Sequence, residues 1–473
     1  MATTDRASKT RTTAARRPRA RTAEQIGRTP VGPRPIPQLT QGSTAKIPKT
    51  ADVTLASGLR LIAVRKPGTP LVEARLRIPF AGQRVSPQLH SARAELLAAT
   101  LMLGTASRNR QQVDADLAVV GGHLNASVDS QRLMISGSVL STGLPVLLAV
   151  LADTLTDAAF RSGDVRGEQS RLHEQLAIAL SQPSTVARKH LQQRRFGDHP
   201  AAWDMPLAED LDAVTLAAVR GLYRRQVVPA GSTLVLVGDL SPARIVDEVA
   251  KALGEWTSER SAVFLGSPPP IIGGPIGAFD RPGAVQSQVR LSAPAVGRDH
   301  DGYPAQQLAN LIYGGYFSSR LMENIREDKG YTYGASSSTQ FWPGRAAITV
   351  SFDTNTESTA AAIWEANYEL GRITLVPPST AEVDSARNYA LGTLATALAT
   401  QAGYASMISN LAAYGLDAKW LADYRKRVAA VDVDEVHSLA RSIFAPSAFM
   451  GVVVGDLSVI GSALSAVVPV EFP

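Results

Sequence analysis

The chain has 473 residues, of which 45% are hydrophobic and 19% charged, a composition typical of globular proteins. Because this length is too great for one ordinary hydrophobic core, we expect two to four domains. It contains no cysteine, which excludes disulfides, thiolate metal sites and a cysteine nucleophile. Because no apolar stretch reaches the roughly 18 residues of a membrane span and residues 1–30 lack a secretory h-region, we expect a cytoplasmic protein with no membrane span.

The positive charge is concentrated at the start of the chain. Residues 1–50 carry eight Arg and three Lys against two acidic residues, a net charge of +9, so the other 423 residues carry −3. A slightly acidic folded part predicts no nucleic-acid partner. Residues 1–49 have few large apolar groups, and we predict a disordered tail. The tail contacts an acidic partner or membrane surface, serves as a transit peptide, or has no function. Its Pro content disfavours a transit helix and favours an extension without a function.

Runs of strands and amphipathic helices follow the tail. Apolar patterning and turn residues predict strands at 59–66, 71–80, 123–130 and 133–140, and helices at 91–103, 109–120, 144–155 and 164–179. Strands in runs favour antiparallel pairing, with the helices in a second layer. The fold class expected from this order is α+β, with an antiparallel-rich sheet that has helices packed on one face.

The sequence contains an internal repeat. The tetrapeptide V-G-D-L follows an apolar strand pattern at Val237 and again at Val454, 217 residues later. We therefore predict two tandem homologous domains in a clam-shell arrangement, residues 50–262 and 281–473. The Pro/Gly-rich segment 263–280 is the expected linker, and within it "FLGSPPPIIGGPIGAF" should exclude a continuous helix or a central strand.

The stretch "HSARAELLAATLMLGT", residues 90–105, raises the question of a metal site. His90 and Glu95 are five residues apart, so on a helix they do not share a face. No two of the seven histidines lie within four residues of each other, which excludes a local H-E-x-x-H zinc motif. We expect His90 at the surface ahead of the helix, and residues 96–103 as a buried core helix.

A second stretch, "YGGYFSSRLMENIREDKGYTYGASSS", residues 313–338, predicts a defined order of helix break, helix and strand. Gly314 and Gly315 should break one helix, Ser318 should cap the next, and Gly330 should end it. A strand is predicted to begin directly afterwards, at Tyr331.

This strand should present two phenols to one face. Tyr331 and Tyr333 are two residues apart, and Arg326 lies one turn before the helix end, near the strand. A guanidinium and a phenol can both donate hydrogen bonds to a peptide carbonyl. Equally, a cation suits a helix C-terminus and Tyr suits a half-buried strand. Both interpretations stay open on the residues alone.

The tandem organisation and three quoted stretches together resemble a known family. "LMLGTASRN", then "VGGHLNASVDSQRLMISGSVL", and "FSSRLMENIREDKGYTYGASSS" in the second copy are similar to the insulinase, or pitrilysin-like, zinc peptidases. The similarity is greatest to the short bacterial members and to the mitochondrial processing peptidase subunits. It covers roughly residues 50–470.

The resemblance implies that the zinc motif is degenerate. The family's zinc helix reads H-x-x-E-H, with the second His six residues before the Thr of a G-T pair. Counting back from Thr105 puts Glu95 at the first His, Ala98 at the catalytic Glu and Ala99 at the second His. The family's third ligand should be a Glu near position 175 or 176, where this chain has Glu174, Gln175 and Leu176. The resemblance thus implies no metal and no general base in this chain.

The second motif is intact by the same comparison. The family's substrate-contacting Arg, and the Tyr seven residues later, match Arg326 and Tyr333, while Tyr331 is a possible substitute. Gly314 and Gly315 either let the backbone approach a substrate or only break a helix. The resemblance therefore implies a substrate-binding, non-zinc subunit of a heterodimer, inactive alone. The expected partners are a zinc-bearing homologue and a peptide or unfolded polypeptide. The alternatives are a non-catalytic scaffold and a peptide-binding protein that acts alone.

Overall fold

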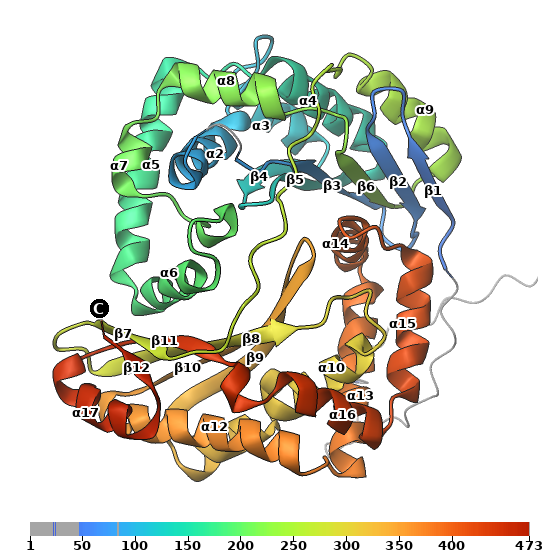
Figure 1. Cartoon of the computed structure of the whole chain (residues 1–473). Coiled ribbons are helices and arrows are strands. Elements are labelled where there is room, and N and C mark those ends of the chain that lie inside the picture. The colour runs from blue at the N-terminus through green and yellow to red at the C-terminus, as the bar shows by residue number, and fades with distance from the viewer. Residues whose placement is uncertain (1–21, 23, 25–46, 83–84, 473) are drawn as a thin grey trace, which may run out of the picture. The chain divides into compact units, whose positions relative to one another are not determined.

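The structure is a computed structural model that describes residues 22, 24, 47–82 and 85–472 (Figure 1). Nearly all of the basic head lies outside these residues, so the expected disorder of the tail stays a prediction. From Ile47 onward the chain forms one compact unit with two six-stranded sheets. None of the helices in the described ranges is both long enough and apolar enough to cross a membrane.

The first sheet is mixed but mostly antiparallel. Its strand order is β1-β2-β6-β3-β5-β4, and only β2 and β6 pair in parallel. The predicted strands match β2, β3, β4 and β5 closely. The strands are β1 (Thr50–Thr54), β2 (Arg60–Arg65), β3 (Leu71–Pro79), β4 (His123–Val128), β5 (Arg132–Leu140) and β6 (Thr233–Gly238).

Helices of the same half cover one face of this sheet. Alternate residues of β2 and β6, such as Leu61 and Leu234, join the core that these helices build. The four predicted helices match α2 to α5. The helices of this half, of which α6 packs on the second sheet instead, are α2 (Pro87–Leu101), α3 (Arg110–Val119), α4 (Leu144–Asp157), α5 (Ser162–Ser181), α6 (Pro183–Phe196), α7 (Ala208–Asp212), α8 (Leu216–Gln226) and α9 (Pro242–Ala252).

The second sheet has the order β12-β7-β11-β8-β10-β9, with β12, β7 and β11 parallel and the other pairs antiparallel. Its strands are β7 (Ile276–Asp280), β8 (Gln286–Ala295), β9 (Thr332–Trp342), β10 (Arg345–Asn355), β11 (Met450–Gly455) and β12 (Val470–Glu471). The expectation that the Pro/Gly segment excludes a central strand is wrong for residues 276–279, which lie in β7. Gly277 permits the close packing there, since a Cβ would meet the Arg194 guanidinium side chain at 2.9 Å.

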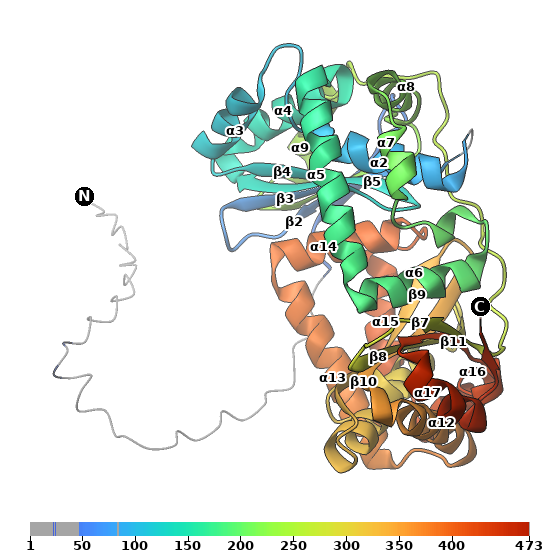
Figure 2. The same ribbon diagram turned by 90° about the vertical axis from the view of Figure 1, so that its left-hand side faces the viewer.

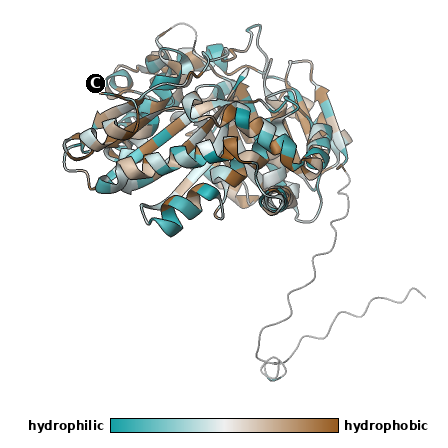
Figure 3. Ribbon diagram, turned by 60° about the horizontal axis from the view of Figure 1, so that its bottom comes forward, coloured by the Kyte–Doolittle hydropathy of each residue, from teal (hydrophilic) through white to brown (hydrophobic). Residues whose placement is uncertain are grey.

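The helices of the second half, except α14, pack on the second sheet in the same way. They are α10 (Tyr303–Asn310), α11 (Arg320–Met322), α12 (Thr359–Leu375), α13 (Thr380–Ala399), α14 (Gln401–Ala412), α15 (Ala418–Ala430), α16 (Val433–Ile443) and α17 (Leu457–Val467), with π-helical turns η3 (Leu311–Gly315) and η4 (Glu323–Asp328). In Figure 3 many helices change between hydrophilic and hydrophobic residues along their length, as amphipathic helices do.

The two V-G-D-L copies occupy equivalent places. β6 and β11 each lie third in their sheets, parallel to one neighbour and antiparallel to the other. The glycine of each copy ends the strand against a neighbour, because a Cβ on Gly238 would meet Leu71 O at 2.2 Å and one on Gly455 would meet Ser287 Oγ at 2.4 Å. The α+β class with two related mixed sheets is therefore confirmed.

Each sheet is covered on its second face by a helix from the other half, which the expectation of helices on one face did not include (Figures 1 and 2). α6 packs on β11 and β8, and α14 packs on β6 and β3. The contact of α6 includes Leu191 and Phe196 against Val452, and that of α14 includes Tyr404 and Ile408 against the sheet. We call this arrangement the helix exchange.

A buried arginine secures α6 in the helix exchange. Arg195 is 4% exposed, and its Nε donates to Ser292 Oγ at 2.9 Å. Its Nη1 donates to Gln192 Oε1 at 3.0 Å and to Gln340 Oε1 at 2.7 Å, and its Nη2 donates to Thr349 Oγ1. Burial lowers the pKa of this guanidinium to about 9.

Candidate functional site

The degenerate zinc-motif positions lie on α2. Ser86 caps the helix by accepting a hydrogen bond from Leu89 N at 3.2 Å, and Pro87 occupies its first turn. Ala98 is 6% exposed and belongs to the core of the first half, while Ala99 is half-buried. Neither methyl group offers a donor atom to a metal or a proton to a substrate.

The prediction that His90 lies at the surface ahead of the helix is wrong. The cap at Ser86 starts α2 four residues before the histidine, so His90 is helical and 7% exposed. Its Nε2 lies 2.8 Å from Phe80 O, and this contact to a carbonyl assigns the proton to Nε2. Burial lowers the pKa of His90. A neutral, buried histidine here is a packing residue of the first half.

Glu95 occupies a half-buried position next to two other carboxylates. It lines a small cavity with Asp129 and Asp204. Burial, and then the charges of these two neighbours, raise its pKa from 4.5 to about 7. Asp204 is paired with Arg188 at 3.1 Å, although burial raises its pKa as well. An uncompensated carboxylate of this kind weakens the fold when it ionises.

This environment predicts a pH-dependent effect of Glu95→Gln. The folded-state pKa is above the unfolded value, so the unfolded chain ionises first and wild-type stability falls as the pH rises from about 4.5 to about 7. The variant should raise the free energy of unfolding by about 2 kcal/mol at pH 8 and by less than about 1 kcal/mol at pH 5. Thermal melts at both pH values measure this.

Glu174→Gln is the matched control, because Glu174 is exposed on α5. It should leave the melting temperature unchanged at both pH values. If Glu95→Gln raised the free energy of unfolding equally at pH 5 and pH 8, ionisation of Glu95 would not be what destabilises the wild-type fold.

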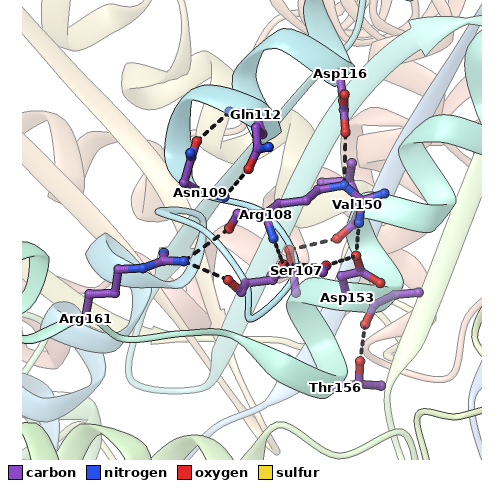
Figure 4. Close-up of polar contacts among 12 residues, drawn as sticks. Ser107, Arg108, Asn109, Gln112, Asp116, Val150, Asp153, Thr156 and Arg161 are labelled. Atoms are coloured by element: carbon purple, nitrogen blue, oxygen red, sulfur yellow. Dashed lines mark hydrogen bonds and ion pairs between the residues drawn. The ribbon is translucent and has the colours of Figure 1, made fainter.

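The loop after α2, residues 103–109, is held by polar contacts (Figure 4). Arg108 donates to Asp116 Oδ2 at 2.9 Å and is paired with Asp153, and Arg161 Nη2 donates to Thr105 O at 3.0 Å. Gly104 has φ +127°, a conformation that favours glycine, and a Cβ there would meet Arg108 O at 2.8 Å. The G-T pair of this loop therefore shapes the turn between α2 and α3.

The second candidate stretch folds as a short helix, a π-helix and a strand. The N-cap of α11 is Ser319, whose Oγ accepts from Met322 N at 3.5 Å, so the expected cap at Ser318 is wrong by one residue. Gly330 has φ +65° and ends the helical segment as predicted, with Tyr331 N donating to Ile325 O at 2.9 Å. The reversal at Gly330 packs the start of β9 back against η4.

Arg326 projects from η4 with its side chain 33% exposed. Its guanidinium lies 4.7 Å from the centre of the Phe317 ring, itself 65% exposed, and its Nη1 donates to Glu327 Oε1 at 2.7 Å. These contacts are with surface residues of the same segment. They orient the guanidinium and leave it accessible.

Tyr333 is the most exposed of the two candidate tyrosines. Its side chain is 90% exposed, and it forms no hydrogen bond within the described ranges. The pairing of β9 with β10 shifts between Thr332 and Ala335, so Tyr333 lies at a bulge. Tyr331 lies before the strand and packs against the core of the second half. The expectation that the two tyrosines share a strand face is therefore wrong.

The two glycines lie in η3, where the backbone packs closely. A Cβ on Gly314 would meet Ser337 Cβ at 2.9 Å, and one on Gly315 would meet Asn310 O at 3.0 Å. Close packing against β9 accounts for small residues here, and a role in substrate binding stays a prediction. The neighbouring strand β10 lies between β8 and β9 and has no free edge to which a peptide could pair.

The comparisons with known proteins agree with this architecture. A sequence profile of the insulinase family, peptidase family M16, matches residues 60–205, and the profile of the peptidase M16 inactive domain matches residues 213–389. The two ranges together span more than half of the chain. The chain belongs to the insulinase (M16) family.

Bacterial relatives of this M16 chain are distant in sequence. An uncharacterized zinc protease of Streptomyces coelicolor is 25% identical over 295 residues, which are 60% of this chain and 63% of that protein. The match thus spans less than two thirds of that relative's length. An uncharacterized zinc protease of Mycobacterium leprae is 24% identical over 324 residues, 66% of this chain and 72% of that protein.

Solved structures show the same fold. The peptidase M16 inactive domain from Pseudomonas fluorescens superposes with a TM-score of 0.79 at 19% identity, over 86% of this chain and 98% of that chain. A protease from Helicobacter pylori also gives 0.79, at 17% identity, over 87% and 100%. Identities this low establish the fold alone.

The zinc that these relatives are named for does not fit the predicted positions in this M16 chain. Ala98 and Ala99 have no ligand atoms, Glu174 is exposed on α5, and the buried side chain next to it, Leu176, is apolar. In the described part of the chain, no three His, Asp or Glu side chains are grouped so that they could hold a metal ion. Glu95 alone offers too few ligands for zinc, which takes at least three from a protein.

Sequence reasoning missed several polar residues of the site region. Arg195 in the helix exchange and Asp204 beside Glu95 belong to segments for which no role was predicted. Arg195 bonds to three residues of the second sheet, and Asp204 lies beside Glu95; no local pattern reports contacts between such distant segments. An arginine followed by an aromatic residue at the end of a helix, as in Arg195 and Phe196, is the nearest signal.

Proposed function

We propose that this chain is the substrate-binding, non-zinc subunit of a two-chain peptidase that is completed by a zinc-bearing homologue. The observation that carries the proposal is Tyr333. Its phenol is 90% exposed on a bulge and has no bond to the described residues, so the fold does not use it. A donor that the fold leaves free, seven residues after an accessible guanidinium, suits a peptide carbonyl.

The division of roles follows from the side chains present. The partner would supply the zinc ion and the general base, and hence the activated water. In this chain Tyr333 would donate to the carbonyl oxygen on which negative charge develops, and Arg326 would hold a neighbouring carbonyl of the peptide. Peptides and unfolded polypeptides are the proposed substrates, because both donors address the main chain.

The edge of β9 beside Tyr333 is partly occupied. Asn310 Nδ2 donates to Ser337 O at 3.1 Å, and the Tyr414 hydroxyl donates to Phe341 O at 3.2 Å. These side chains use carbonyls that an added strand would need. We therefore expect the partner subunit to supply most main-chain hydrogen bonds to the peptide.

Co-expression with an H-x-x-E-H homologue tests the proposal. The expected result is a complex of the two chains that cleaves unfolded peptides in a zinc-dependent manner, while this chain alone is inactive. A Glu→Gln change in the partner's motif is the control, and it should abolish cleavage without affecting assembly. Zinc-dependent hydrolysis by this chain alone would contradict the division of roles.

Two other results would replace the proposal. A stable complex that cleaves no peptide, with either zinc or chelator present, would favour a non-catalytic scaffold. A monomer by native mass measurement, with or without the homologue, would favour a peptide-binding protein that acts alone.

A further inference from the structure

A cationic cavity of about 300 Å³ lies in the first half, away from the Arg326/Tyr333 segment. Three arginines line it from separate segments: Arg93 on α2, Arg225 on α8, and Arg260 in the segment that follows α9. Its remaining lining is mostly apolar or neutral, and no carboxylate of the described residues is among it. We call this the arginine cavity.

Two of the cations in the arginine cavity, Arg93 and Arg260, have no counter-ion among the described residues. Among the described residues, neither Arg93 nor Arg260 forms an ion pair, and the Nε of Arg93 is buried without a hydrogen-bond partner. Converging like charges repel, and a buried N–H without a hydrogen-bond partner is unfavourable. An anion in the cavity would relieve both costs.

Gln226 adds an acceptor to these donors. It is 7% exposed and lines the cavity, and its Nε2 donates to Ala81 O at 3.1 Å. That bond fixes the orientation of the amide, so its oxygen is directed elsewhere, and Gln226 Oε1 is buried without a partner. The cavity therefore combines cationic donors with one neutral acceptor.

We propose that the arginine cavity binds a small phosphate-bearing anion. The arginines donate to the anionic oxygens, and Gln226 Oε1 accepts from the P–OH of a phosphate that retains a proton. A volume near 300 Å³ is at the lower end of small-molecule sites, roughly 300–1,000 Å³, and suits inorganic phosphate or the ester of a small metabolite. The site does not depend on the proposed peptidase role.

Titration calorimetry and thermal melts of the full chain test this site with inorganic phosphate, glycerol 3-phosphate, sulfate and citrate at constant ionic strength. The expected result is saturable binding of phosphate or its ester, with sulfate at least about tenfold weaker, because sulfate has no proton for Gln226 Oε1. Tighter binding of the ester than of free phosphate identifies a metabolite, and the reverse identifies inorganic phosphate. Citrate that binds as tightly as phosphate would overturn the proposal.

Three variants assign the binding to these residues. Arg260→Gln, at an exposed position, should weaken phosphate binding by about tenfold or more. Gln226→Leu should remove the preference for phosphate over sulfate, and its melt without ligand checks that it folds. Arg244→Gln is the matched control, since this arginine is 82% exposed on α9 and outside the cavity. A melting-temperature rise that is linear in concentration and equal in all variants would show a general salt effect only.

Discussion

Tyr333→Phe in the reconstituted two-chain peptidase is expected to lower kcat by about 100-fold to 1000-fold, the usual cost of losing one donor to a developing oxyanion. The change removes one oxygen atom from a side chain that is 90% exposed and has no hydrogen bond to the described residues. Folding and assembly should therefore be unaffected. Peptide turnover under saturating substrate, together with the KM, measures the effect.

Arg326→Ala should act differently from Tyr333→Phe. A guanidinium that holds a neighbouring carbonyl binds the substrate and the transition state alike, so its loss should mainly raise KM. Tyr331→Phe tests the substitute role and should change little, because Tyr331 packs against the core. Tyr368→Phe, 55% exposed on α12, is the matched control. Unchanged turnover in Tyr333→Phe, with normal assembly, would mean that the Tyr333 hydroxyl has no role in catalysis.

Arg195→Ala is expected to lower the free energy of unfolding by about 3 kcal/mol. The change removes four charge-assisted hydrogen bonds, three of which join α6 to residues of the second sheet, and leaves a cavity beside Trp342. Because these bonds connect the two halves, unfolding should also become less cooperative. Urea denaturation followed by two probes, one in each half, measures both effects.

Arg188→Ala on the same helix is the control for Arg195→Ala. Its side chain is 54% exposed, so the change opens no internal cavity; it removes the partner of Asp204 and should cost clearly less than Arg195→Ala. Arg195→Met fills much of the volume without the hydrogen bonds and should recover only part of the loss. Wild-type stability in Arg195→Ala would mean that the cost of burying the cation cancels its hydrogen bonds.

The elements of the fold followed from local patterns in the sequence. Alternation in residues 59–66 and 233–238 places Leu61 and Leu234 in the core, and each V-G-D-L pattern marks the strand that lies third in its sheet. What local patterns did not reveal were contacts between distant segments. The partners of Arg195 in the second sheet lie 97 to 154 residues away, and α14 covers a sheet whose strands end at residue 238.

The candidate site was predictable in position but not in detail. The prediction for Tyr331 and Tyr333 assumes an unbroken strand. The bulge depends on how β9 pairs with β10, and the sequence of residues 331–338 alone does not specify that pairing. The prediction for His90 begins the helix at Ser91, whereas Ser86 caps it and Pro87 is its first residue. The resemblance to the family located Ala98 and Ala99, whereas the arginine cavity needed the three-dimensional arrangement of α2 and α8.

The helix exchange has a consequence for how the chain is made. During synthesis the strands of the first sheet are complete at residue 238, but α14, which covers one of their faces, begins only at residue 401. Until then Ile62, Val64, Val235 and Val237 have no cover on that face, and exposed apolar strands invite aggregation. During synthesis on the ribosome, the first half therefore exposes an apolar sheet face for a long interval. More than 160 residues are synthesised between the end of β6 and the start of α14, and we expect the apolar face to need shielding during this interval.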